Sequence, residues 1–156
     1  MHARTALLCA CLVAAVSGAS AQSYTQQQLQ DTFMGLLGAD GLQPELLPGG
    51  KLRFRRENRN YVIHVDERDA LYFRMTMAFV ADDKSASMRQ RRLEGCNTAT
   101  SEVKVVKCFL DEDGDPTFAS ELFVVVPGDV KLSMARMLRA MDSAFDRYTR
   151  RVNEGR

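Results

Sequence analysis

The feature that most constrains the fold is a two-residue hydrophobic period that begins at Lys51. Apolar and polar side chains alternate from there to Val80, and the longest uninterrupted run begins at Leu71. This period is typical of β-strands with one buried face, because successive side chains point to opposite faces of a sheet. Turns at 57–60 and 67–69 interrupt the alternation. Turns this short join antiparallel strands, so the sequence predicts a three-stranded meander.

Two more strands are predicted at 103–110 and 117–126, joined by a hairpin at Asp113-Gly114. Helical spacing of apolar residues predicts helices at 25–37, at 84–100 and from the cap Asp129 onward, with Leu132 first on the apolar side of the last helix. The predicted order is α-β-β-β-α-β-β-α. The fold class is therefore α+β, with one five-stranded antiparallel sheet and helices packed mainly on one face.

The first 21 residues have the organisation of a secretory signal peptide. Arg4 is followed by an apolar run from Ala6 to Val16, and Ala19-Ser20-Ala21 forms a small-residue cleavage site. A retained membrane helix is the alternative, which the short run and the cleavage motif disfavour. We expect cleavage near Ala21, no integral membrane segment afterwards, and a single mature domain at 22–156 in the periplasm or outside the cell.

Charge and histidine content argue against several function classes. The 21 Lys and Arg residues nearly balance the 20 Asp and Glu residues, whereas a general nucleic-acid binder usually shows a basic excess. The acidic run 111–115 lacks the EF-hand pattern, because Pro116 and Leu122 stand where that loop needs Gly and Glu. A lone His64 is a poor metal ligand. No catalytic, cofactor-binding or metal-binding residue is predicted, and the protein is not expected to be an enzyme.

Two cysteines, Cys96 and Cys108, remain after removal of the signal peptide. An oxidising compartment allows them to form a disulfide. The objection is geometric, because Cys96 falls inside a predicted helix and Cys108 several residues along the next strand, while a bridge needs Cα atoms within about 7 Å. A disulfide and a pair of buried thiols both remain open.

The sheet face opposite the helices is the most informative candidate site. Such a face should be polar where water covers it, and an apolar one indicates a second copy or a bound protein. Several apolar residues are predicted to point there: Val62, Tyr72, Ala78, Val80, Phe123 and Val125. Arg53 and Arg55 add a basic edge, which either discourages edge aggregation or attracts an acidic partner.

Several motifs carry a family resemblance: Tyr61-Val62-Ile63, the acidic turn 66–69, Tyr72-Phe73, Cys96-Asn97 and the stretch 105–115. With them, residues 25–150 resemble the YbjN-type bacterial domain. The element order is also similar to that of the class I chaperones of type III secretion, which are small dimeric proteins that hold other proteins. The resemblance implies a regulatory or chaperone-like role and no catalytic residues.

The leading hypothesis is a non-enzymatic, exported protein-binding or chaperone-like module. It would act as a homodimer and engage an unidentified protein through its sheet or an exposed edge. The alternative is a small-molecule or lipid carrier that uses a gap between the sheet and the helices. A hydrolase built around His64 is the least favoured hypothesis, because no nucleophile motif accompanies it.

Overall fold

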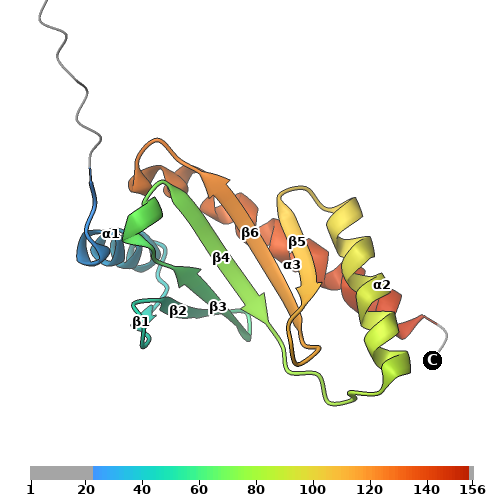
Figure 1. Ribbon diagram of the computed structural model, residues 1–156. Helices are drawn as coiled ribbons and strands as arrows, with labels where there is room; N and C mark the ends of the chain where they lie inside the picture. The colour runs from blue at the N-terminus through green and yellow to red at the C-terminus, as the bar shows by residue number, and fades with distance from the viewer. Residues whose placement is uncertain (1–22, 155–156) are drawn as a thin grey trace, which may run out of the picture.

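The computed structural model describes residues 23–154, and one antiparallel sheet runs through them (Figure 1). Its strands are β1 (Glu45–Leu46), β2 (Leu52–Arg56), β3 (Arg59–His64), β4 (Tyr72–Ala78), β5 (Val106–Leu110) and β6 (Pro116–Phe123). They are arranged in the order β1-β2-β3-β4-β6-β5, so the meander and the later hairpin join where β4 pairs with β6. The predicted signal peptide, residues 1–21, lies outside the described residues.

The helices are α1 (Gln26–Ala39), α2 (Ala86–Glu102) and α3 (Lys131–Asn153), with 3₁₀ turns η1 (Glu67–Asp69) and η2 (Pro127–Val130). The predicted α+β class and element order are confirmed, but the sheet has six strands rather than five. The extra strand, β1, has only two residues, too few for a hydrophobic period to show.

Three predicted positions are wrong in detail. Strand β5 begins at Val106 rather than at residue 103, because Val105 has a left-handed φ of 61° that breaks the extended chain. The η2 turn precedes α3, so Asp129 lies outside the helix that it was expected to cap. Leu132 is 82% exposed and does not join the apolar side of α3.

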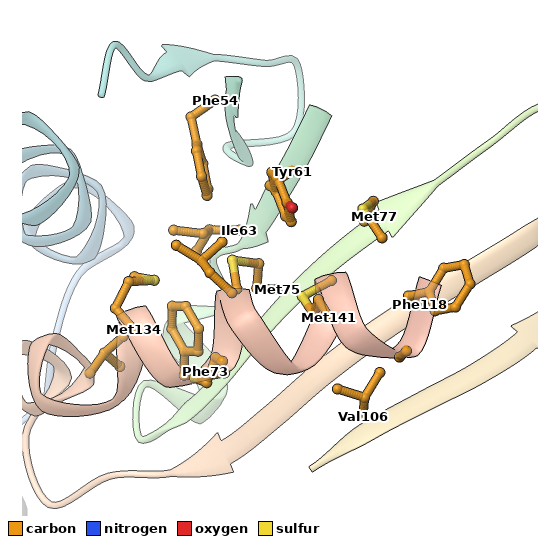
Figure 2. Close-up of a cluster of buried hydrophobic side chains, with 14 of the residues drawn as sticks. Phe54, Tyr61, Ile63, Phe73, Met75, Met77, Val106, Phe118, Met134 and Met141 are labelled. Carbon is orange, nitrogen blue, oxygen red and sulfur yellow. The ribbon is translucent and has the colours of Figure 1, made fainter. Parts of the chain in front are cut away.

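The core lies between α3 and one face of the sheet. In Figure 2, Met134 and Met141 of α3 lie against side chains from the central strands, among them Phe73 and Tyr61. Burial is close to complete for the largest members of this core: Tyr61, Phe54, Phe73, Phe118, Ile63, Met75, Met77 and Met141. Burying such side chains contributes about 1.5–3 kcal/mol each, so this layer supplies most of the stabilisation.

A carboxylate on α3 fixes the helix to the β2–β3 hairpin. Asp142 Oδ1 accepts hydrogen bonds from Arg59 Nη1 at 2.7 Å and from the Tyr61 hydroxyl at 2.8 Å, while Oδ2 accepts from Arg56 Nη1 at 2.7 Å. The Arg59 guanidinium also lies 4.7 Å from the centre of the Phe145 ring. Three charge-assisted or hydroxyl donors on one half-buried carboxylate set the position of α3 along the sheet.

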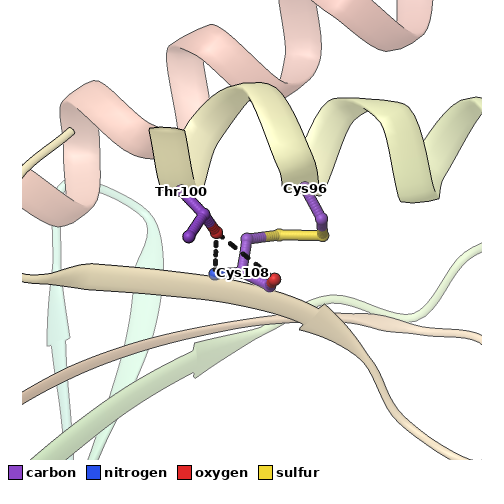
Figure 3. The surroundings of a disulfide bond; sticks show 3 residues. All are labelled: Cys96, Thr100 and Cys108. Carbon is purple, nitrogen blue, oxygen red and sulfur yellow. Dashed lines mark hydrogen bonds between the residues drawn. A yellow bond between two sulfur atoms is a disulfide. The ribbon is translucent and has the colours of Figure 1, made fainter. Parts of the chain in front are cut away.

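Cys96 and Cys108 form a disulfide with a Cα–Cα distance of 4.7 Å (Figure 3). The geometric objection was wrong, because the chain reverses over 103–105 and β5 returns alongside α2. The same contact is reinforced by Thr100, whose Oγ1 accepts a hydrogen bond from Cys108 N at 2.9 Å. The disulfide and this hydrogen bond hold α2 against β5.

At Gly95, α2 packs tightly against α3. A Cβ atom built there would lie 2.8 Å from Tyr148 Cδ2 and 2.8 Å from Val152 Cγ2, closer than packed atoms allow. A glycine inside a helix lowers helix propensity, and here the missing side chain is what lets the two helices pack.

Replacing Gly95 with Ala is expected to destabilise the protein, although Ala favours a helix by about 1 kcal/mol. Overpacking against Tyr148 and Val152 should cost about 1–3 kcal/mol and outweigh that gain. The matched control is Gly35→Ala in α1, where a new Cβ meets nothing within 4 Å and stability should rise. Urea unfolding measures both variants, and a Gly95→Ala protein as stable as the Gly35→Ala protein would contradict the packing argument.

Candidate protein-binding face

All three helices contact the same face of the sheet. Phe33 of α1 packs edge-on against Phe73 at 5.4 Å, and Tyr148 of α3 packs against Phe118 at 5.4 Å. The disulfide brings α2 to the same side. The opposite side, called the outer face, therefore carries no helix within residues 23–154. Strand alternation and register place these residues on it: Arg53, Arg55, Val62, His64, Tyr72, Arg74, Thr76, Lys107, Phe109, Ala119, Glu121 and Phe123.

The apolar residues proposed from the sequence do not form one patch. Tyr72 and Phe123 are paired across β4 and β6, with ring centres 5.3 Å apart, and Phe123 is 76% exposed. Val62 lies on β3 in the middle of the face and is half-buried. Val80 follows the far end of β4, and Val125 lies beyond the end of β6; both are 83% exposed. The structure thus brings Tyr72 and Phe123 together and leaves Val80 at the other end.

A polar network that the sequence did not reveal occupies the centre of the outer face. Arg74 and Glu121 are partners in the β4–β6 register, with 3.6 Å between Arg74 Nε and Glu121 Oε1. Lys107 forms a second ion pair with Glu121. Burial opposes ionisation of Glu121, but hydrogen bonds from Lys107 and Tyr72 and the charge of Arg74 lower its pKa. These residues occupy the polar positions of predicted strands, and only the register could show that they meet.

The basic residues Arg53 and Arg55 lie on β2, at the side of this network. Arg53 is paired with Glu45 of β1, and Arg55 Nη2 donates to Asn58 Oδ1 at 3.0 Å. Both side chains are exposed. Exposed ion pairs contribute little to stability, so these cations remain available to a partner.

A hollow of about 440 Å³ opens beside the polar network, at the junction of β3, η1 and β4. Its lining includes Lys51, His64, Asp66, Glu67, Tyr72 and Arg74, and it is called the His64 hollow below. His64 Nε2 lies 2.9 Å from Thr76 Oγ1. Burial lowers the pKa of His64 to about 4, and the charges of Arg74 and Lys51 act in the same direction.

The surroundings of His64 do not build a catalytic triad. Its hydroxyl partner, Thr76, is buried within the sheet, and no carboxylate among residues 23–154 hydrogen-bonds the imidazole to orient it. Neither does the described part of the chain contain a cluster of three metal-binding side chains. No helix between residues 23 and 154 has the length and apolar character needed to cross a bilayer.

A second opening, a groove of about 480 Å³, lies between the segment 79–83, α2 and α3. Its walls include Phe79, Phe145 and Val152, and the buried Arg92 lies among them. Arg92 Nη1 donates to the carbonyl oxygen of Asp83 at 2.6 Å. The groove thus lies between the end of the sheet and the helices, where the alternative carrier hypothesis expected a gap.

Comparisons with known proteins identify the fold. No family model matches the chain, and no curated protein does. An uncharacterized protein from Methanothermobacter thermautotrophicus is similar, with a TM-score of 0.56 and 13% identity over 80% of this chain and 99% of that one. A chain of the HopA1–SchA chaperone–effector complex is similar with a TM-score of 0.51 and 13% identity, over 79% of this chain and 98% of that one. The chain therefore shares its α+β fold with these two structures.

The low pKa of His64 predicts an acid-sensitive contribution to stability. The unfolded chain binds a proton near pH 6.5, whereas the native side chain resists it until about pH 4. The contribution is therefore complete above pH 6.5 and is lost as the pH falls toward 4. In His64→Gln, the free energy of unfolding should fall less between pH 7 and pH 4.5 than in the wild type. Equal pH dependence, or an imidazole that titrates near 6.5 by NMR, would contradict this prediction.

Proposed function

We propose that this protein is a non-enzymatic, exported protein-binding module that holds a segment of another protein on its outer face. The observation that carries the proposal is the exposed Tyr72–Phe123 pair beside the Arg74–Glu121–Lys107 network, on a sheet face that no described helix covers. A bound segment would cover the aromatic rings and reach the surrounding cations. An aromatic anchor with polar and charged residues around it is typical of protein interfaces.

The geometry favours the face over the free edge of β5. The Cys108 N–H at that edge is already bound to Thr100 Oγ1, and the disulfide holds α2 beside it. Adding a strand there would require α2 to move. The outer face needs no such movement, so we place the partner across β4 and β6.

Charge indicates what kind of segment fits. Glu121, and Glu45 opposite Arg53 in the β1–β2 register, are both engaged by cations, whereas Lys51 and Arg55 form no ion pair among residues 23–154. An incoming segment with acidic and aromatic or aliphatic side chains complements this surface. An acidic, partly apolar peptide segment is therefore the proposed occupant.

Fold similarity supports the same role, because one structural neighbour belongs to a chaperone–effector complex. The Cys96–Cys108 disulfide supports export, because such bonds persist in oxidising compartments. The YbjN-type kinship and the homodimer remain part of the proposal. Light scattering on the mature chain measures its oligomeric state. A monomer would exclude the homodimer but would leave the proposed binding face unaffected.

A carrier of small apolar molecules is the second candidate, favoured by the groove between 79–83, α2 and α3. Its volume of about 480 Å³ falls in the range of ligand pockets, and aromatic side chains form its walls. Native mass spectrometry of the purified protein tests this function. A chain that never retains a small molecule, even after incubation with mixed lipids, would exclude it.

Site-specific photo-crosslinking tests the proposed face. A photoreactive phenylalanine analogue at Phe123 should capture a specific protein in cells that express the full chain. The same analogue at Leu93, on the outward side of α2, is the control and should not capture it. The captured segment is then made as a peptide, and Phe123→Ser should weaken its binding at least about tenfold, the effect of losing one aromatic anchor.

Capture of no protein at position 123 would reject this function, and so would either of two further results. One is capture of the same proteins from positions 93 and 123, which would indicate nonspecific contact. The other is a captured peptide that binds Phe123→Ser as tightly as the wild type. The control variant Leu93→Ser is tested in parallel, by thermal melting and by titration with the same peptide. Comparison with it distinguishes a local change at the outer face from a general loss of folding.

A further inference from the structure

The acids that line the His64 hollow are already satisfied by the protein. Asp66 accepts two hydrogen bonds from the Arg68 guanidinium, from Nε at 2.9 Å and from Nη2 at 2.8 Å. Glu67 Oε2 accepts from the backbone N of Gln26, at the start of α1, at 2.9 Å. Among the described residues, neither carboxylate forms an ion pair with Lys51 or Arg74, the cations of the hollow.

The side chains of Lys51 and Arg74, the cations that line the hollow, lack hydrogen-bond partners within residues 23–154. The Lys51 side chain is exposed and forms no hydrogen bond or ion pair among the described residues; only its backbone carbonyl accepts one, from Leu47 N. Arg74 Nε is buried without a hydrogen-bond partner, and its ion pair with Glu121 spans 3.6 Å. Glu121 is itself shared with Lys107. A buried donor without an acceptor is costly, so Arg74 Nε lacks one hydrogen-bond acceptor at this site.

The hollow also has an apolar wall. Tyr72 lines it, and the Tyr72 ring lies 5.3 Å from the Phe123 ring on the neighbouring strand. A volume of about 440 Å³ is larger than a carboxylate alone needs and falls in the range of small-ligand pockets. The site therefore has room for a carboxylate together with an adjacent apolar side chain.

We infer that the His64 hollow is a subsite for a carboxylate that a peptide carries next to an apolar side chain. This inference rests on the proposed function, since it assigns one contact of the segment held on the outer face. Arg74 and Lys51 would bind the carboxylate oxygens, and Tyr72 with Phe123 would pack against the apolar group. His64, which is paired with Arg74 in the β3–β4 register, also lines the subsite.

Small probes test the subsite without any partner protein. N-acetyl-phenylalanine carries a terminal carboxylate, N-acetyl-aspartyl-phenylalaninamide carries a side-chain carboxylate, and N-acetyl-phenylalaninamide carries none. NMR titration should show both carboxylates binding at least about tenfold more tightly than the neutral amide, as expected for one charge-assisted contact. Residues 23–154 contain one histidine, so the His64 ring signals report the site. If N-acetyl-phenylalanine binds more tightly, the carboxylate is that of a chain terminus. If N-acetyl-aspartyl-phenylalaninamide binds more tightly, it is that of an acidic side chain.

Lys51→Met is the decisive variant, because Lys51 is exposed and unpaired and its loss should not affect folding. It should weaken binding of N-acetyl-phenylalanine about tenfold. Lys104→Met, at an exposed lysine in the turn between α2 and β5, is the matched control and should leave binding unchanged. Thermal melts of both variants confirm that each is folded.

Three outcomes would overturn the subsite. The neutral amide could bind as tightly as the acids, Lys51→Met could bind as tightly as Lys104→Met, or the His64 signals could stay still while others move. Displacement of N-acetyl-phenylalanine by an equal concentration of inorganic phosphate would also overturn it, because the apolar wall would then contribute nothing. If the probes bind but no protein is captured at Phe123, the proposed function fails while the subsite stands.

Discussion

The packing of α3 along one face of the sheet is the contact on which the rest of the structure depends. Its methionine-rich side buries the inner residues of the central strands, and Asp142 fixes its position by accepting from two arginines and a tyrosine. Because α1 and α2 join the same layer, the described chain forms two layers and leaves the other side of the sheet uncovered (Figure 1). The polar groups of the outer face therefore bond to one another, to water or to a partner.

The contact between α2 and β5 decides how a partner could approach. An unprotected edge strand invites pairing with another chain. Here the Thr100 hydroxyl binds the Cys108 N–H, and the disulfide keeps the helix in place. Closing this edge leaves the outer face, with its exposed ring pair, as the more accessible surface for a protein segment.

The outer face combines two kinds of recognition. The Tyr72–Phe123 pair offers apolar area, while the network around Glu121 and the cations of the His64 hollow favour negative charge. The hollow connects them, since Tyr72 belongs to both. Such a combination suits a segment in which an acidic group adjoins an apolar one, and it disfavours a purely apolar or basic segment.

The sequence alone determined five of the six strands, the three helices and the class of the fold. The regular spacing of inward apolar residues over 71–80 and the helical spacing in the later part of the chain are local patterns, which can be recognised in a single sequence. The two-residue β1 and the left-handed Val105 have no such pattern, which is why the strand number and the start of β5 were missed. Tertiary structure decided the remainder, because pairing of β4 with β6 and the return of β5 along α2 bring distant residues together. Arg74 meets Glu121, and Cys96 meets Cys108, only through that register and that reversal of the chain.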